Sequence, residues 1–316
     1  MSNFTKSFTP ASTFLPNKKA GYFQKRARRN VITFLLMAAP ALIWFLTMVG
    51  WPTIDMFFIS LFRWNGGILQ PKTFAWFSNY IELFKSTDFF HAVGISVVQV
   101  LVTLPLTMIP AFALGYYLTL RRPGYRALRI IFFSPALIST AVRAMMFYGI
   151  FIPDGLLNGL LRLIGLSQFT HLWMGEPQTA LFSVILIDIW GGIGYNGVLL
   201  FTFLSSISKE LYEAAELDGA GPWALMWRIA FPLSLEFFGI LTMLEFLWVV
   251  MGTAGIILLL TKGGPGTAST TLGYLMYDMA FHTRLLGKSQ AIAVILFIVG
   301  MAAMLLIRRL TRKQYD

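Results

Sequence analysis

Six long apolar stretches constrain the fold of this chain more than any other feature. Each runs for at least 17 residues with at most one charged side chain, and an α-helix rising about 1.5 Å per residue needs about 20 such residues to cross a bilayer. The composition agrees, with 57% hydrophobic residues, 12% charged residues and a mean hydropathy of +0.69. We therefore expect an all-α polytopic membrane protein that lies in the lipid bilayer, with spans at Val31 to Ile54, Ala92 to Leu120, Ile130 to Pro153, Thr179 to Ser208, Phe237 to Thr261 and Ala291 to Ile307.

Lys and Arg are divided unevenly among the connections between these stretches. Of the 25 basic residues, 17 lie in the N-terminal arm, in the second and fourth connections, or after the last stretch, all on one side of the membrane. Because basic connections stay in the cytoplasm, we expect a multi-pass protein of the cell (inner) membrane with both termini cytoplasmic. The net charge of +11 is then a topology signal, and no nucleic-acid partner is expected. The domain organisation predicted is an arm at 1–30 and a six-helix domain at 31–316.

The residue types needed for catalysis or metal binding are scarce. Cysteine is absent and the three histidines are scattered, so no metal site and no catalytic residues are expected. Gly287, Lys288 and Ser289 end like a nucleotide-binding loop, but His282 stands where the first glycine of that loop belongs. We interpret this tripeptide as a coincidence and expect this chain to bind no cofactor.

The connection at 206–234 has helical signals that an ordinary loop lacks. Ser208 can cap a helix that Gly219 and Gly221 end, and Pro222 suits the first turn of a second helix, which Pro232 is expected to stop. The pattern therefore predicts helix, tight turn, helix. On these signals alone, a plain amphipathic helix pair resting on the membrane is an equal alternative.

The sequence EAAELDGA in this connection, followed by Trp223, Arg228, Ile229 and Pro232, resembles the EAA motif of permease subunits of bacterial ATP-binding-cassette importers. In that family the motif docks on the cytoplasmic ATPase. Met226 replaces the phenylalanine usual there, which is a conservative change in bulk. The resemblance implies that ATPase coupling is carried by Glu213, Ala214, Ala215, Asp218, Gly219 and Ala220.

A second segment, LTKGGPGTASTTLGYLMYDMAF at Leu260 to Phe281, is similar to carbohydrate-uptake permeases of the maltose-transporter type. Membership of that group implies a sugar or oligosaccharide substrate and a second, homologous permease subunit. It also implies two ATP-binding subunits that hold ATP and Mg, and an extracytoplasmic solute-binding protein. ATP hydrolysis would then reside on a separate subunit, and this chain would not be an enzyme.

Three charged side chains, Arg143, Asp188 and Glu245, are expected near the middle of the bilayer. A charge left in lipid there costs at least about 2.5 kcal/mol, so these groups must face protein, water or each other. They either pair structurally or line a polar translocation cavity, and both interpretations remain open. The resemblance implies substrate contacts from the fourth and fifth spans, so the candidate path comprises Arg143, Asp188, Trp190, Gly192, Tyr195, Asn196, Glu245 and Trp248.

Two other functions remain as alternatives. An importer for an acidic saccharide or a glycerophosphate-type solute is favoured by Arg143 and opposed by Asp188 and Glu245. An ion-conducting membrane protein, from a different class, is supported only by the two buried acids. A membrane-embedded enzyme would need a convergent acid, base or metal cluster, which the histidines do not provide.

Overall fold

A computed structural model describes residues 33–67 and 69–312, most of which are helical. Six stretches among these residues are long and apolar enough to cross a membrane. The all-α fold with six spanning segments is therefore confirmed, whereas the predicted arm at 1–30 lies outside the described residues. The six stretches are Thr33–Ser60, Thr87–Thr119, Thr140–Leu163, Pro177–Leu204, Pro222–Leu260 and Leu286–Thr311.

The chain forms two compact units, Met1–Asp55 and Met56–Asp316. The described part of the first unit, 33–55, is helical. It contains the π-helical segment η1 (Leu46–Gly50) and the beginning of α2 (Trp51–Ser60). Large hydrophobic side chains such as Phe34 and Trp44 are exposed along it, as suits a helix surrounded by lipid.

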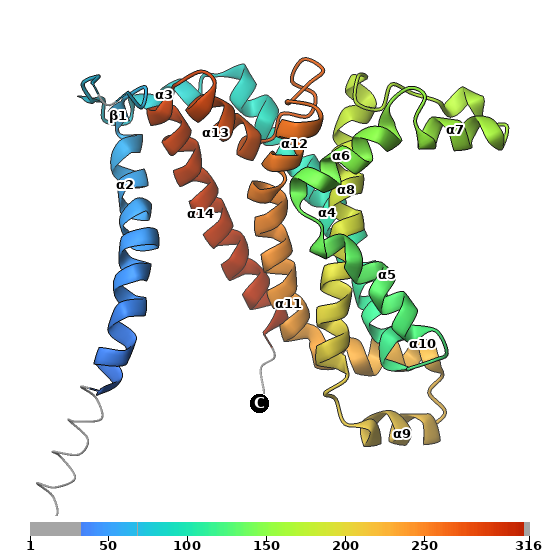
Figure 1. The fold of residues 1–316 in the computed structure, drawn as a ribbon. Helices are drawn as coiled ribbons and strands as arrows, with labels where there is room; N and C mark the ends of the chain where they lie inside the picture. The colour runs from blue at the N-terminus through green and yellow to red at the C-terminus, as the bar shows by residue number, and fades with distance from the viewer. Residues whose placement is uncertain (1–32, 68, 313–316) are drawn as a thin grey trace, which may run out of the picture. The chain divides into compact units, whose positions relative to one another are not determined.

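The second unit carries the rest of the described elements (Figure 1). A short antiparallel hairpin is formed by β1 (Phe62–Arg63) and β2 (Thr73–Phe74). In Figure 1, α9 lies at one end of this unit, called the α9 end below, and α3 and α13 lie at the other, called the α13 end. The helices are α3 (Ser78–Leu83), α4 (Thr87–Thr119), α5 (Tyr125–Leu137), α6 (Thr140–Phe151), α7 (Leu156–Leu163), η2 (Ser167–Phe169), α8 (Pro177–Leu204), α9 (Lys209–Leu217), α10 (Pro222–Ala224), η3 (Leu225–Ala230), α11 (Phe231–Leu247), η4 (Trp248–Gly252), α12 (Ala254–Leu260), α13 (Leu272–Phe281) and α14 (Leu286–Thr311).

Helices α4 and α8 form the most extensive packing between described elements. Glycines allow this close approach, since a Cβ at Gly115 of α4 would lie 2.9 Å from the carbonyl oxygen of Gly197 of α8. Helix α5 crosses α8 closer still, because a Cβ at Gly194 would lie 1.5 Å from the carbonyl oxygen of Phe132. Small residues at helix crossings are typical of membrane bundles, where packing rather than the hydrophobic effect holds helices together.

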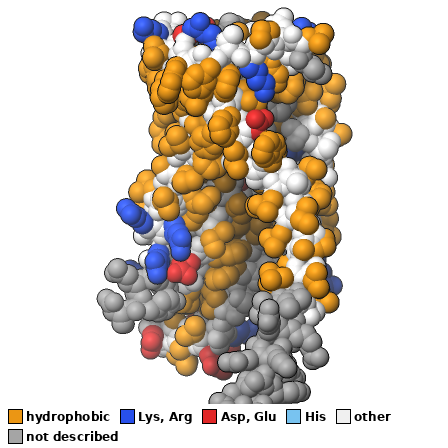
Figure 2. Space-filling view, turned by 90° about the vertical axis from the view of Figure 1, so that its left-hand side faces the viewer, with side chains coloured by type: hydrophobic (Ala, Val, Ile, Leu, Met, Phe, Trp, Pro, Cys, Tyr) orange, Lys and Arg blue, Asp and Glu red, His pale blue; other side chains and the backbone are white. Residues whose placement is uncertain are grey.

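The surface of the spanning helices is apolar. Leu101, Ile131, Phe182 and Ile298 are all more than half exposed. Figure 2 shows hydrophobic side chains over most of the middle of the visible face, with Lys, Arg, Asp and Glu mainly towards its two ends. This distribution matches a protein whose middle faces lipid and whose ends face headgroups and water.

The third crossing differs from the expected continuous helix over Ile130 to Pro153. Helix α5 ends at Leu137, Ile138 is extended (φ −84°, ψ 130°), and α6 begins at Thr140. The hydroxyl of Ser139 accepts a hydrogen bond of 3.4 Å from the Val142 amide, which caps the new helix. Hydropathy does not detect such a break, because the residues on both sides of it are equally apolar.

The prediction that Pro232 ends the second helix of the 206–234 connection was wrong. Helix continues from Pro222 to Leu260 through the π-helical segment η3. The Phe231 amide bonds to the carbonyl of Met226, five residues back, and this wider turn directly precedes the proline. Pro232 is the second residue of α11, so its missing N–H falls next to this wider turn and not within a regular stretch of α-helix.

An ion-pair network fastens the hairpin at the α13 end. Glu82 pairs with Lys288 at 2.8 Å and also with Arg63. Hydrogen bonds from Lys288, Ser78 and Arg63 lower the Glu82 pKa from 4.5 to about 2. Gly287 is required beside them, because a Cβ there would lie 2.0 Å from the Phe62 carbonyl oxygen. The tripeptide that resembles a nucleotide loop is thus part of a structural junction.

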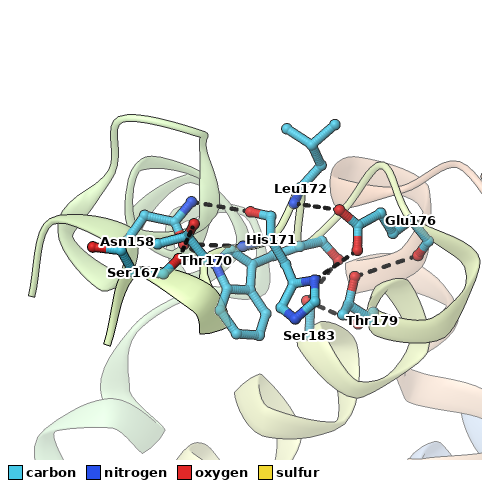
Figure 3. A network of polar contacts seen from close by, with 9 residues as sticks. Asn158, Ser167, Thr170, His171, Leu172, Glu176, Thr179 and Ser183 are labelled. Atoms are coloured by element: carbon cyan, nitrogen blue, oxygen red, sulfur yellow. Dashed lines mark hydrogen bonds and ion pairs between the residues drawn. The ribbon is translucent and has the colours of Figure 1, made fainter. Parts of the chain in front are cut away.

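A second polar network joins α7 to the start of α8 (Figure 3). The Asn158 amide donates to the carbonyl of His171 at 3.0 Å and accepts from the Trp173 indole at 2.8 Å. His171 contacts Glu176 at 2.8 Å, and the Glu176 pKa is lowered by the Leu172 backbone amide and by His171. This network fixes where α8 begins, and therefore the depth in the membrane at which the residues of α8 lie.

Candidate functional site

A cavity of about 360 Å³ lies among α5, α6, α8, α11 and η4. The break between α5 and α6 and the π-helical segment η4 both border this cavity. Irregular backbone within a membrane protein is tolerated where it lines a cavity. The cavity combines aromatic, amide and charged side chains in an otherwise apolar region. The lining residues are Ala136, Arg143, Gly191, Gly192, Tyr195, Asn196, Leu244, Glu245 and Trp248.

The break between α5 and α6 places Arg143 on the cavity wall. Arg143 is 9% exposed, and its side chain makes no hydrogen bond or ion pair with any residue in the described part of the chain. Its guanidinium lies over the Trp248 ring, 5.8 Å from the ring centroid. Gly191 makes room for it, because a Cβ there would lie 2.4 Å from Nη1. A buried, unpaired cation beside a cavity is unusual and demands a partner.

Trp248 reaches the cavity from the π-helical segment η4. Gly252 lies directly against the indole, and a Cβ there would be 2.6 Å from the ring. The indole Nε1 donates a hydrogen bond of 3.2 Å to Oδ1 of Asp188. The position of the indole is therefore bounded by the Asp188 carboxylate and by Gly252.

Asp188 itself does not line the cavity. It is 1% exposed, and its Oδ2 accepts hydrogen bonds from Thr253 at 2.6 Å and from Gln99 at 3.5 Å. Gln99 belongs to α4, whereas Trp248 and Thr253 belong to η4 and its junction with α12. Asp188 thus joins three spanning segments and positions the indole on the wall.

Glu245 and Asn196 are in direct contact where they line the cavity. The Asn196 amide donates to Oε2 of Glu245 at 2.8 Å and to the carbonyl of Gly192 at 3.0 Å. Oε1 of Glu245 has no hydrogen-bond partner among the described residues. It lies against the bare backbone of Gly192, where a Cβ would be 2.7 Å away. The hydroxyl of Thr107 on α4 is also unpartnered within the described ranges, and Thr107 borders the same glycine.

The structure brings six of the eight candidate path residues to the cavity: Arg143, Gly192, Tyr195, Asn196, Glu245 and Trp248. Asp188 lies behind the wall, and Trp190 packs edge-on against Phe147 with ring centroids 5.3 Å apart. The prediction missed Thr253 and Gln99. Gln99 belongs to buried polar residues at intervals of three or four along α4, namely Ser96, Gln99, Thr103 and Thr107, a signal that was available in the sequence.

The helix and turn predicted at 206–234 are present as α9 and α10. The hydroxyl of Ser208 accepts a hydrogen bond from the Glu210 amide at 3.3 Å, and Gly219 adopts φ +87°. Ala215 and Ala220 pack on a hydrophobic cluster around Leu225 and Met226. Burial raises the pKa of the neighbouring Tyr212. The other candidate coupling residues are exposed: Glu213, Ala214, Asp218 and Gly219.

The segment that follows the fifth span is a self-bonded loop. Ser269 donates to the carbonyl of Gly264 at 2.8 Å, and Thr270 donates to the carbonyl of Gly263 at 3.0 Å. The hydroxyl of Ser96 on α4 accepts the Leu272 amide at 2.8 Å. The loop is therefore held together by its own hydrogen bonds, and the bond between Leu272 and Ser96 joins α13 to α4 at the α13 end.

Residues 104–314 match the model of the protein family described as "Binding-protein-dependent transport system inner membrane component". The match covers well over half of the chain. The chain belongs to this family. The family region contains the whole cavity lining, as well as α9 and its turn, so both candidate sites are features of this inner membrane component.

Relatives are similar over almost their entire length. A probable ABC transporter permease, YurN of Bacillus subtilis, is 36% identical over 287 residues, which are 88% of this chain and 95% of the relative. The trehalose/maltose transport system permease MalF of Thermococcus litoralis is 27% identical, covering 89% and 94%. The sn-glycerol-3-phosphate transport system permease UgpA of Brucella abortus is 29% identical, covering 88% and 94%.

The fold has a solved counterpart. A chain in the crystal structure of a bacterial ABC transporter involved in the import of the acidic polysaccharide alginate superposes with a TM-score of 0.78. The match covers 93% of this chain and 100% of the other at 22% identity. The ABC permease fold expected from the two sequence motifs is thereby confirmed.

Proposed function

We propose that this chain forms, with a second homologous permease subunit, the translocation path for a sugar or oligosaccharide delivered by a solute-binding protein. The observation that carries the proposal is the cavity between spanning helices, which offers ring faces and unpartnered polar groups. Tyr195, which is 45% exposed on the cavity wall, supplies a surface on which a sugar ring can stack, and Trp248 borders the same cavity. Asn196, Glu245 and Arg143 supply donors and acceptors for hydroxyl groups. The relative MalF, a permease of a trehalose/maltose transport system, supports the same substrate class.

ATP and Mg are proposed to bind two separate ATP-binding subunits, one of which contacts this chain at α9. The exposed Glu213, Ala214, Asp218 and Gly219 provide a rigid, charged docking turn. Closure of the ATP-binding subunits would move α9 and switch access to the cavity. This coupling works only if the turn binds the two nucleotide states unequally.

The orientation proposed puts both termini and the α9 end in the cytoplasm. Helix α14 ends with Arg308 and Arg309 in its last turn, and the connection between α4 and α5 carries Arg121 and Arg122. Basic residues concentrated at one end of the spans favour retention of that end inside the cell. The solute-binding protein would then approach the α13 end.

An acidic saccharide or a glycerophosphate-type solute is the second candidate cargo. The unpaired guanidinium of Arg143 is the observation in its favour, and the relative UgpA, a permease of an sn-glycerol-3-phosphate transport system, belongs to this class. An ion-conducting role is less well supported, because Asp188 is buried and occupied by three donors.

Affinity purification of the tagged chain from its native membrane in mild detergent tests the proposal, with mass spectrometry of the retained proteins. The proposal predicts an ATP-binding protein and a second six-span permease in stoichiometric amounts. A tagged, unrelated six-span protein from the same membrane serves as the control. Recovery of the folded chain without these partners in mild detergent would contradict the importer assignment.

A further inference from the structure

The two buried acids at and behind the cavity wall differ in the hydrogen bonds that they accept. Among the described residues Asp188 accepts three, and its donors are Gln99, Trp248 and Thr253. An ionised carboxyl group only accepts, so this set of donors suits a negative charge on Asp188. Glu245 accepts a single hydrogen bond from a described residue, which the Asn196 amide donates to Oε2 at 2.8 Å. The donors therefore stabilise a charge on Asp188 far better than on Glu245.

The other oxygen of Glu245, Oε1, is buried and has no hydrogen-bond partner in the described part of the chain. The residue as a whole is 6% exposed. A negative charge shared by this oxygen would have neither water nor a donor to stabilise it, and an unpaired buried charge is costly. A proton on Oε1 removes that charge and leaves Oε2 able to accept from Asn196.

The nearby charges also favour a neutral Glu245. Arg143 of α6 and Asp188 of α8 act on it electrostatically, in opposite senses. No ion pair joins Glu245 to Arg143 among the described residues. The positive charge of Arg143 and the negative charge of Asp188 balance each other. A second carboxylate would therefore leave an uncompensated charge inside the membrane.

The other described elements that pack against α11 are α4, α14, η3 and η4. Beside Glu245, α4 brings Thr107, whose hydroxyl has no described partner, and η4 brings the Trp248 ring. Tyr195 is the other titratable side chain on the cavity wall, and Glu236 lies about two and a half turns earlier on α11. The charged residues of η3 and of the first and last turns of α14 are Arg228, Lys288, Arg308 and Arg309.

We infer that Glu245 is a proton-binding site: in the described state Oε1 carries a proton, and the carboxyl group is neutral. The proton comes from water that reaches the cavity, and Asp188 remains as the counter-charge of Arg143. Movement of the surrounding helices that admitted water to Oε1 would stabilise the ionised form and release the proton. Such a site goes beyond the proposed function, because it requires no particular cargo.

Infrared spectroscopy detects a protonated carboxyl group directly, because its C=O stretch lies above the bands of carboxylates and of peptide groups. The whole purified complex is measured at neutral pH, where exposed carboxyl groups are ionised. A maltoside detergent is used, since it has no ester carbonyl in this region. A second sample contains glutamate labelled with carbon-13 at the side-chain carboxyl, which lowers the C=O frequency of glutamate and leaves that of aspartate in place.

The wild type should show a protonated carboxyl band that moves to lower frequency in the labelled sample. Glu245→Gln should lose this band. Glu245→Asp should keep a band in the same region, but that band should no longer respond to labelled glutamate. Glu216→Gln, at an exposed position on α9, is the matched control and should have the spectrum of the wild type.

A wild-type spectrum without a label-sensitive band would overturn the assignment of a proton to Glu245. Persistence of the whole band in Glu245→Gln would overturn it as well. If Glu245→Gln fails to fold, Glu245→Asp decides, because a band that still moved with the label would have to come from another glutamate. Absence of an ATP-binding subunit from the purified material counts against the proposed function instead, and it leaves the spectrum readable.

Discussion

The indole Nε1 of Trp248 donates a hydrogen bond of 3.2 Å to Oδ1 of Asp188, so a carboxylate outside the cavity holds a ring on its wall. Thr253 completes the arrangement with a bond of 2.6 Å to Oδ2. Asp188 lies on α8, whereas both partners belong to the segment around η4. A mid-membrane acid therefore acts as a joint between helices and as the support of a candidate substrate contact.

Replacement of Asp188 by Asn should destabilise the protein by about 1 to 3 kcal/mol, because one amide hydrogen must face a donor and the charge-assisted bonds are lost. Thr253→Val should cost less, since it removes one of the three donors. Thermal unfolding of the purified protein in detergent measures both. Asp154→Asn, at an exposed ion pair with Arg162, is the control and should have no measurable effect.

Gly194→Ala should prevent normal packing of α5 on α8. The added Cβ would lie 1.5 Å from the carbonyl oxygen of Phe132, so the backbones must separate, at a cost of about 3 kcal/mol or more. Gly149→Ala on α6 is the matched control, because no atom lies within 4 Å of its Cβ. Size-exclusion profiles should show loss of monodisperse protein only for the first variant, and equal profiles would refute this account of the crossing.

Gly219 and Gly221 provide a matched pair in the α9 turn. A methyl group added at either position would meet no atom within 4 Å, but Gly219 has φ +87° whereas Gly221 has φ −75°. Alanine at 219 should therefore strain the turn by about 1 kcal/mol, and alanine at 221 should not. We expect Gly219→Ala to reduce, and Gly219→Asp to abolish, co-purification of the ATP-binding subunit without affecting membrane insertion. Normal association of Gly219→Asp would disprove the coupling role.

Glu82 should contribute a pH-dependent term to stability at the α13 end. Its folded pKa of about 2 lies below the ordinary 4.5, so the contribution is complete above pH 4.5 and is lost as the pH falls towards 2. The side chain is 36% exposed, which keeps the expected contribution below about 1 kcal/mol. Unfolding of the wild type and Glu82→Gln should therefore converge between pH 4.5 and 2; a constant difference across that window would contradict the assignment.

The number and approximate position of the spans were predictable, because hydropathy over about 20 residues reports directly on burial in lipid. The break at Ile138 and the continuation through Pro232 were not, since each depends on a local exchange of hydrogen bonds that leaves hydropathy unchanged. Six path residues were found because aromatic, amide and charged groups are rare in apolar helices. The prediction placed Asp188 on the path, whereas it lies behind the cavity wall. Its three donors come from segments distant in sequence, so these hydrogen bonds could not be predicted.

A photo-crosslinking residue at Leu217, compared with one at Leu163, tests the central claim most directly. Leu217 ends α9 and is 90% exposed, and Leu163 ends α7 and is 83% exposed. The two helices lie at different ends of the second unit (Figure 1). In native membranes, position 217 should crosslink to an ATP-binding protein and position 163 should not. A crosslink to an ATP-binding protein from position 163 alone would contradict the account. The absence of such a crosslink from both positions would contradict it as well.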